Sequence, residues 1–226
     1  MTSYRTIHEA SLDQLLYWWD HPGSLEPDFS QEELMDEVAY ALTEHGDAGV
    51  PTLKRHLYDD DTGRRNAALS ALSWPKTDDA EIRSALHTAY ESSDGSTRYT
   101  ALWGFIHLEY FPLSEAHISG PLTSDDERMA ALAMVYLSRA HQQKAASLLR
   151  DGLRSSNRYK RSYACDEIGD RYIIELTSDM SPLLQDSVAE VRQAAQSNLE
   201  FFCEELAASR DARPAPYSAS NSSPSR

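Results

Sequence analysis

The chain has 226 residues, of which 41% are hydrophobic and 25% are charged, and its formal net charge is −15. This acidic balance argues against nucleic-acid binding, because neutralising phosphates requires clustered Lys and Arg. A transmembrane helix needs about 18 consecutive apolar residues, and no stretch of the sequence is nearly that long. We therefore expect no membrane partner.

The N-terminal stretch MTSYRTIHEASLDQ lacks the basic start and apolar run of a secretory signal. Two cysteines, Cys165 and Cys203, are too few for a disulfide framework. Both lie in apolar, helical contexts, where a buried free thiol is the usual outcome. We therefore expect a cytoplasmic protein.

The first predicted element is a short helix with Leu15, Trp18 and Trp19 on one face, at the i, i+3 and i+4 positions. We expect residues 1–29 to form a helical cap, because an array of repeats needs a covered end. The alternative is that Trp18 and Trp19 form an exposed aromatic anchor for a partner protein.

The body of the chain, residues 30–206, contains a repeated Arg-x-x-Ala pattern. Its copies are Arg65–Ala68, Arg98–Ala101, Arg128–Ala131, Arg161–Ala164 and Arg192–Ala195. Successive arginines are 33, 30, 33 and 31 residues apart. A period of this length is typical of stacked supersecondary units.

Each copy has similar surroundings. A polar or acidic stretch, such as DDDTG or TSDDE, comes first and supplies helix caps. An apolar helix, a break and a second amphipathic helix follow. We therefore predict an all-α fold, an α-solenoid of about five to six helical hairpins. Gly120 and Pro121 lie in the short second helix of the third repeat, and Pro182 should kink or split that of the fifth.

The repeated alanine and arginine both suggest structural roles. Small side chains allow two helices to approach closely, so we expect the alanines at helix contacts, where a large residue would cost about 1–3 kcal/mol. The arginine is placed to bond the acidic helix start of a neighbouring repeat.

This pattern resembles the HEAT-repeat family over roughly residues 30–203. DAGVPTLKRHLYDDD looks like that family's second helix, and DSVAEVRQAAQSNL looks like its first helix. The resemblance implies a protein-binding scaffold whose second helices line a concave face. The candidate contact residues on that face are Lys54, Arg55, Tyr58, Arg83, His87, Tyr90 and Gln143.

The charge is concentrated in the first 60 residues, which contain 13 Asp and Glu against 3 Lys and Arg. Such a segment attracts a basic partner. Glu33, Asp36 and Glu37 are therefore further candidate binding residues.

Catalytic patterns are scarce. There is no glycine-rich phosphate loop and no Gly-x-Ser-x-Gly, and His8-Glu9 is a single His-Glu pair. We expect no cofactor and no metal. In TALWGFIHLEYF, the aromatic residues favour core packing, with a groove for a hydrophobic ligand as the alternative.

The last segment, residues 207–226, is rich in Ser, Ala and Pro and predicts a disordered tail. Taken together, the sequence favours a non-enzymatic scaffold or adaptor, or an acidic inhibitor or immunity-type protein. The alternative is an enzyme on the same scaffold, either a lyase or a metal-dependent modifying enzyme.

Overall fold

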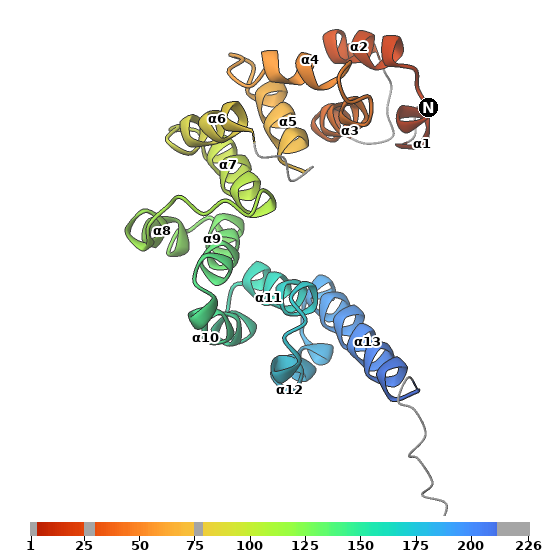
Figure 1. Cartoon of the computed structure of the whole chain (residues 1–226). Helices are drawn as coiled ribbons and strands as arrows, with labels where there is room; N and C mark the ends of the chain where they lie inside the picture. The colour runs from red at the N-terminus through yellow and green to blue at the C-terminus, as the bar shows by residue number, and fades with distance from the viewer. Residues whose placement is uncertain (1–3, 25–29, 75–78, 212–226) are drawn as a thin grey trace, which may run out of the picture. The chain divides into compact units, whose positions relative to one another are not determined.

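The computed structural model describes residues 4–24, 30–74 and 79–211, and every regular element in these ranges is a helix (Figure 1). The predicted all-α, repeat-like fold is confirmed. The chain divides into two compact units, residues 1–148 and residues 149–226. The division falls within helix α10 (Gln142–Leu153).

Unit 1 begins with short helices and continues with alternating first and second helices. Its elements before α10 are α1 (Tyr4–His8), α2 (Leu12–Asp20), the 3₁₀ helix η1 (Pro22–Ser24), α3 (Gln31–Glu44), α4 (Val50–Arg55), α5 (Thr62–Ser73), α6 (Ala80–Tyr90), α7 (Gly95–His107), α8 (Glu115–Leu122) and α9 (Glu127–Ala140). As predicted, α8 is short and contains Gly120 and Pro121.

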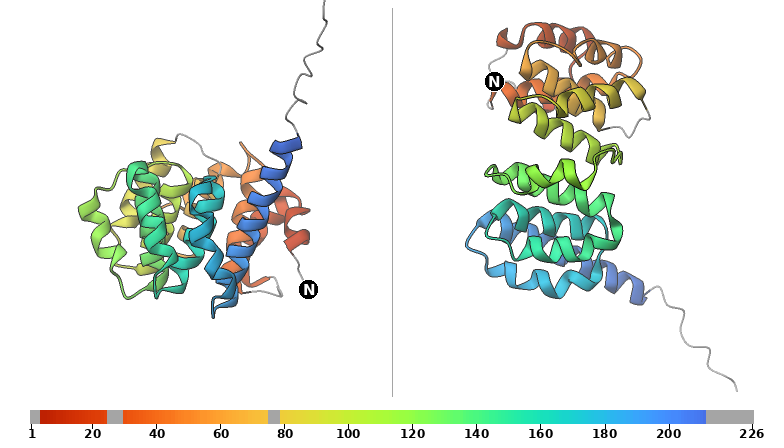
Figure 2. Two further views of the ribbon diagram at one scale, coloured as in Figure 1. Left: turned by 90° about the horizontal axis from the view of Figure 1, so that it is seen from below. Right: turned by 90° about the vertical axis from the view of Figure 1, so that its left-hand side faces the viewer.

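The first helices of unit 1 lie side by side in one layer (Figures 1 and 2). α3 packs on α5, α5 on α7, and α7 on α9, and we call these four helices the first-helix layer. The second helices pack against this layer: α4 on α5, α6 on α7, and α8 on α9 (Figure 1). α1, α2 and η1 pack against α3, at the end of the layer.

Polar side chains begin the first helices, as the sequence predicts. Each accepts a hydrogen bond from a backbone N–H in the first turn, which would otherwise have no partner. These caps are Ser30 for α3, Asp61 for α5, Asp94 for α7, Asp126 for α9 and Asn157 for α11 (Arg158–Asp170). The hydrogen bonds to Thr97 and Ser96 lower the pKa of Asp94 to about 2, so its carboxylate stays ionised at neutral pH.

The repeated alanine lies on the buried side of each first helix. All five of these alanines are completely buried. In α7, Gly104 lies one turn after Ala101, and a Cβ there would come within 2.7 Å of both Leu86 in α6 and Ser73 in α5. The helices therefore approach too closely at this point for a larger side chain.

Unit 2 contains one interrupted helical pair and a long last helix. Its elements after α10 are α11, η2 (Ile174–Leu176), α12 (Thr177–Met180), η3 (Ser181–Gln185) and α13 (Ala189–Asp211). Pro182 lies at the start of η3, so the predicted split of this second helix is confirmed. α11 packs on α13, and Asn198 Nδ2 donates a 3.2 Å hydrogen bond to Asp166 Oδ1 between them.

The end of the chain differs from its sequence pattern in two respects. α13 continues to Asp211, beyond residue 206, and residues 212–226 of the predicted tail lie outside the described residues. Cys165 is buried, which raises the pKa of its thiol to about 12, but the prediction that Cys203 is buried is wrong. Cys203 lies on an outward-facing side of α13.

Among the described helices, none is long and apolar enough to cross a membrane.

Candidate functional site

The repeated arginines brace the start of their own helices. Arg65, Arg161 and Arg192 each donate a hydrogen bond to the backbone carbonyl six residues earlier, that of Asp59, Ser155 and Asp186 respectively. Two of them also reach the next repeat: Arg65 Nη2 lies 3.2 Å from Thr97 Oγ1, and Arg161 pairs with the Asp186 carboxylate. The side chains of Arg98 and Arg128 are exposed.

Three of the predicted binding residues are engaged within the chain. The Arg83 guanidinium lies over the Tyr110 ring, 4.5 Å from its centroid, and His87 Nε2 lies 3.1 Å from the Tyr110 hydroxyl. The Tyr90 hydroxyl donates a 3.1 Å hydrogen bond to the carbonyl of His117. These side chains connect α6 to the segment that follows α7.

The other predicted contact residues lie in or near α4, except for Gln143 in α10. Lys54 forms ion pairs with Asp79 and Glu81 at the start of α6, and these carboxylates raise the pKa of Lys54. Arg55 Nη2 donates a 3.0 Å hydrogen bond to Thr52 Oγ1. Tyr58 is 54% exposed and Gln143 of α10 is also exposed.

The two neighbouring tryptophans of α2 differ in exposure. Trp19 is completely buried, with its ring centroid 5.5 Å from that of His56, so it is not accessible to a partner. Trp18 is partly exposed. The predicted binding role of Trp19 is therefore incompatible with this packing, because Trp19 and Leu15 form the face of α2 that faces the protein interior.

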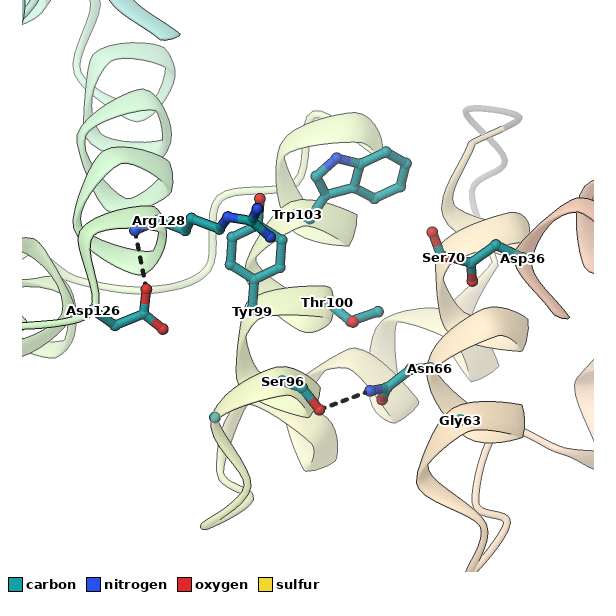
Figure 3. Close-up of a pocket in the computed structure, with 11 residues that line it drawn as sticks. Asp36, Gly63, Asn66, Ser70, Ser96, Tyr99, Thr100, Trp103, Asp126 and Arg128 are labelled. Atoms are coloured by element: carbon teal, nitrogen blue, oxygen red, sulfur yellow. Dashed lines mark hydrogen bonds between the residues drawn. The ribbon is translucent and has the colours of Figure 1, made fainter. Parts of the chain in front are cut away.

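A pocket with a volume of about 430 Å³ lies on the first-helix layer, and we call it the first-helix pocket (Figure 3). Its lining residues are Asp36, Gly63, Asn66, Ser70, Gly95, Ser96, Tyr99, Thr100, Trp103, Asp126 and Arg128. They come from α3, α5, α7, α9 and the cap of α9. Of these, the sequence singled out Asp36 as a binding residue, Arg128 as a repeat position and Trp103 as part of the aromatic stretch, whereas the resemblance pointed to the second helices.

Two lining residues of the first-helix pocket share one repeat position. Ser70 and Trp103 each lie five residues after a repeat arginine, and this offset was the sequence signal that could have identified the pocket. The lining also includes Asn66, directly after Arg65, and Ser96, two residues before Arg98. Asn66 Nδ2 donates a 3.2 Å hydrogen bond to Ser96 Oγ (Figure 3).

Asn66 also contains a buried acceptor. Its Oδ1 has no hydrogen-bond partner among the described residues. Leaving such an acceptor unpaired costs about 1–3 kcal/mol.

A cluster of aromatic side chains lies next to the first-helix pocket, around Trp103. Trp74, at the end of α5, is 58% exposed and stacks on Trp103 with 5.9 Å between ring centroids. His107 lies 4.9 Å from Trp74, and Tyr40 lies 6.1 Å from it at an angle of 76°. We call these four residues the aromatic cluster. The structure thus divides TALWGFIHLEYF: Phe105 is completely buried, whereas Trp103 lines the first-helix pocket.

A second pocket, with a volume of about 400 Å³, is lined in part by Tyr40 and Trp74 of the aromatic cluster. We call it the His8 pocket, and its lining residues are His8, Glu37, Tyr40, Thr43, Glu44 and Trp74. His8 Nε2 lies 3.0 Å from Glu37 Oε2, and Nδ1 lies 3.4 Å from Glu44 Oε1. Glu33 instead caps α3, and its hydrogen bonds with Ser30 lower its pKa.

In the ranges that the structure describes, no group of three or more His, Cys, Asp or Glu side chains is arranged to hold a metal ion. The two pockets bring together carboxylates, aromatic rings and amide or hydroxyl groups. This chemistry suits the binding of a cationic, donor-rich group.

Comparisons with known proteins give no name for this arrangement. No protein-family model and no curated protein matches the chain. One similar solved structure is an engineered protein described as Northeast Structural Genomics Consortium Target OR329. It is 18% identical, covers 84% of this chain and 97% of its own, and superposes with a TM-score of 0.44.

Proposed function

We propose that this chain is a non-enzymatic, HEAT-like scaffold or adaptor that binds a basic segment of a partner protein in the first-helix pocket. An inhibitor or immunity-type protein would use the same contact. We also propose a cytoplasmic location, because Cys165 and Cys203 are both free thiols.

The observation that carries this proposal is the lining of the first-helix pocket. Asp36 and Asp126 provide negative charge, and Tyr99 and Trp103 provide aromatic faces. Lys and Arg side chains carry positive charge and an apolar stem, so they complement both features. In Figure 3, the chain's own Arg128 points toward Tyr99, which illustrates how a cation fits here.

We therefore propose that the binding face lies on the first helices, not on the second helices as the resemblance implied. Lys54, Arg83, His87 and Tyr90 already have partners within the chain. Replacing them would disturb the packing between repeats. Asp36 and Trp103 also have contacts within the chain, Trp103 with the rings of Trp74 and His107, but they can be replaced without removing a helix cap or a fully buried side chain.

The test is affinity capture from a lysate of the native host with the purified chain as bait. We expect the wild-type chain to retain a basic protein that elutes as salt rises from about 50 to 500 mM, because screening weakens charge attraction. The double variant Asp36→Lys, Trp103→Ala should lose this protein. Photo-crosslinking from position 100, on the same face, should attach the same protein.

The matched control is Asp47→Lys, which makes the same charge change at an exposed residue between α3 and α4. It should retain the partner. Equal capture by the double variant, or elution that is indifferent to salt, would contradict the proposal.

A further inference from the structure

The His8 pocket has the form of a receptor for a planar cation. Tyr40 and Trp74 meet at 76° and provide two walls, and more than half of Trp74 is exposed. Glu37 and Glu44 lie two turns apart on the same side of α3, so their carboxylates reach the cavity from its two ends. Aromatic faces and carboxylates together select positive charge.

The His8 side chain, which lines the pocket, indicates the shape of the ligand. His8 of α1 places its imidazole ring between the two carboxylates, with one ring nitrogen toward each. A protonated imidazole is a flat cation with N–H donors at both ends. A guanidinium group has the same features and in addition stacks on indole rings and binds carboxylates in a bidentate manner.

We propose that the His8 pocket receives an arginine side chain of the partner protein, which displaces the His8 ring from Glu37 and Glu44. This inference rests on the proposed function, because the arginine belongs to the basic segment in the adjoining first-helix pocket. Trp74 and Trp103 stack on each other and each lines one pocket, so a single extended segment can contact both.

The competition between His8 and arginine depends on pH. Hydrogen bonding to Glu37, opposed by partial burial, raises the pKa of His8 above its ordinary value. The internal His8 contact is therefore present below about pH 6.5 and is lost as the pH rises through the raised pKa. Neutral His8 leaves both carboxylates uncompensated, so the arginine should bind more tightly at pH 8 than at pH 6.

Other charged groups surround this pocket. Arg5 pairs with Glu9 on α1, Tyr4 has its pKa raised by burial and by Glu33 and Glu37, and Asp36 lies beside Glu37 on α3. His107 of α7 lies against Trp74 and is a second imidazole close to this pocket. The test must therefore separate His8 from His107.

The test is a ¹H–¹⁵N NMR titration of the full chain with acetyl-Gly-Arg-Gly-amide, followed through the Trp74 indole N–H, which Trp74→Phe assigns. We expect saturable shifts, at least about fivefold weaker binding of the isosteric citrulline peptide, and weaker binding of the lysine peptide. Glu37→Gln and Glu44→Gln should each weaken binding, whereas Glu9→Gln should not. Because Glu44 is 61% exposed, Glu44→Gln tests the pocket even if Glu37→Gln disturbs folding.

His8→Gln should bind the arginine peptide more tightly at pH 6 and lose most of the difference between pH 6 and pH 8. His107→Gln should keep that difference. Equal binding of the citrulline peptide, or an unchanged pH dependence in His8→Gln, would overturn the inference. Failure of the peptide to bind would overturn the inference but leave capture through the first-helix pocket intact. Loss of capture with intact peptide binding would refute the proposed function and the partner as the source of the arginine, while the arginine preference of the His8 pocket would stand.

Discussion

At the scale of single residues, a two-contact ion pair connects Arg161 in α11 to Asp186 before α13. Arg161 Nε and Nη2 lie 2.7 Å and 2.9 Å from the two carboxylate oxygens, and the Asp186 side chain is only 8% exposed. Asp186 also accepts a hydrogen bond from the backbone N–H of Val188. The pair therefore fixes the junction between two successive repeats.

We predict that Asp186→Asn lowers the free energy of unfolding by about 3 kcal/mol, because it leaves a shielded guanidinium without its counter-charge. Arg161 lowers the pKa of Asp186, so this stabilisation is present above about pH 4 and is lost as the pH falls through the lowered pKa. Urea unfolding from pH 3 to pH 7 measures both effects. Asp151→Asn, at an exposed position of α10, should change little.

At the scale of the helix, small residues set how closely neighbouring helices pack. Ala131 of α9 is completely buried, and α9 packs on both α7 and α8. The same principle applies to Gly49 at the start of α4, where a Cβ would lie 2.0 Å from the backbone oxygen of Leu42. Backbone atoms cannot move aside cheaply, so glycine is needed at this turn.

We predict that Ala131→Leu destabilises the chain by about 1–3 kcal/mol through overpacking. Thermal unfolding followed by circular dichroism measures this loss. The matched control is Ala116→Leu on the exposed side of α8, which should stay within about 0.5 kcal/mol of wild type. Equal stability of the two variants would show that Ala131 does not mark a close helix contact.

At the scale of the whole molecule, 36 acidic residues oppose 21 basic ones. Like charges repel in any compact state, and salt screens this repulsion. We predict that raising NaCl from about 20 to 300 mM at pH 7.5 increases the melting temperature by about 2–4 °C, which for this length corresponds to about 1 kcal/mol.

The same salt series near pH 5 provides the control for this prediction. The pI is about 4.8, so the net charge there is close to zero and the increase should disappear. An equal increase at both pH values would mean that salt acts through something other than the net charge.

The sequence by itself determined the local features. Caps such as Asp61 and Asp126 depend on hydrogen bonds within one helical turn, and breaks such as that at Pro182 depend on a missing N–H, so both are readable from neighbouring residues. The repeat period likewise predicted helices in successive pairs. These interactions are local, and no knowledge of distant residues is required.

Only the tertiary structure decided which side of the repeats holds a pocket. The aromatic cluster combines Tyr40, Trp74, Trp103 and His107 from three different helices, and the His8 pocket joins α1 to α3 and to the end of α5. The rotation of each helix about its own axis sets these meetings. In α7, the side that carries the buried Ala101 and the closely approached Gly104 faces its neighbours. Residues 29 to 33 apart in the sequence become neighbours because the first helices stack in register, and that register is a property of the assembled layer.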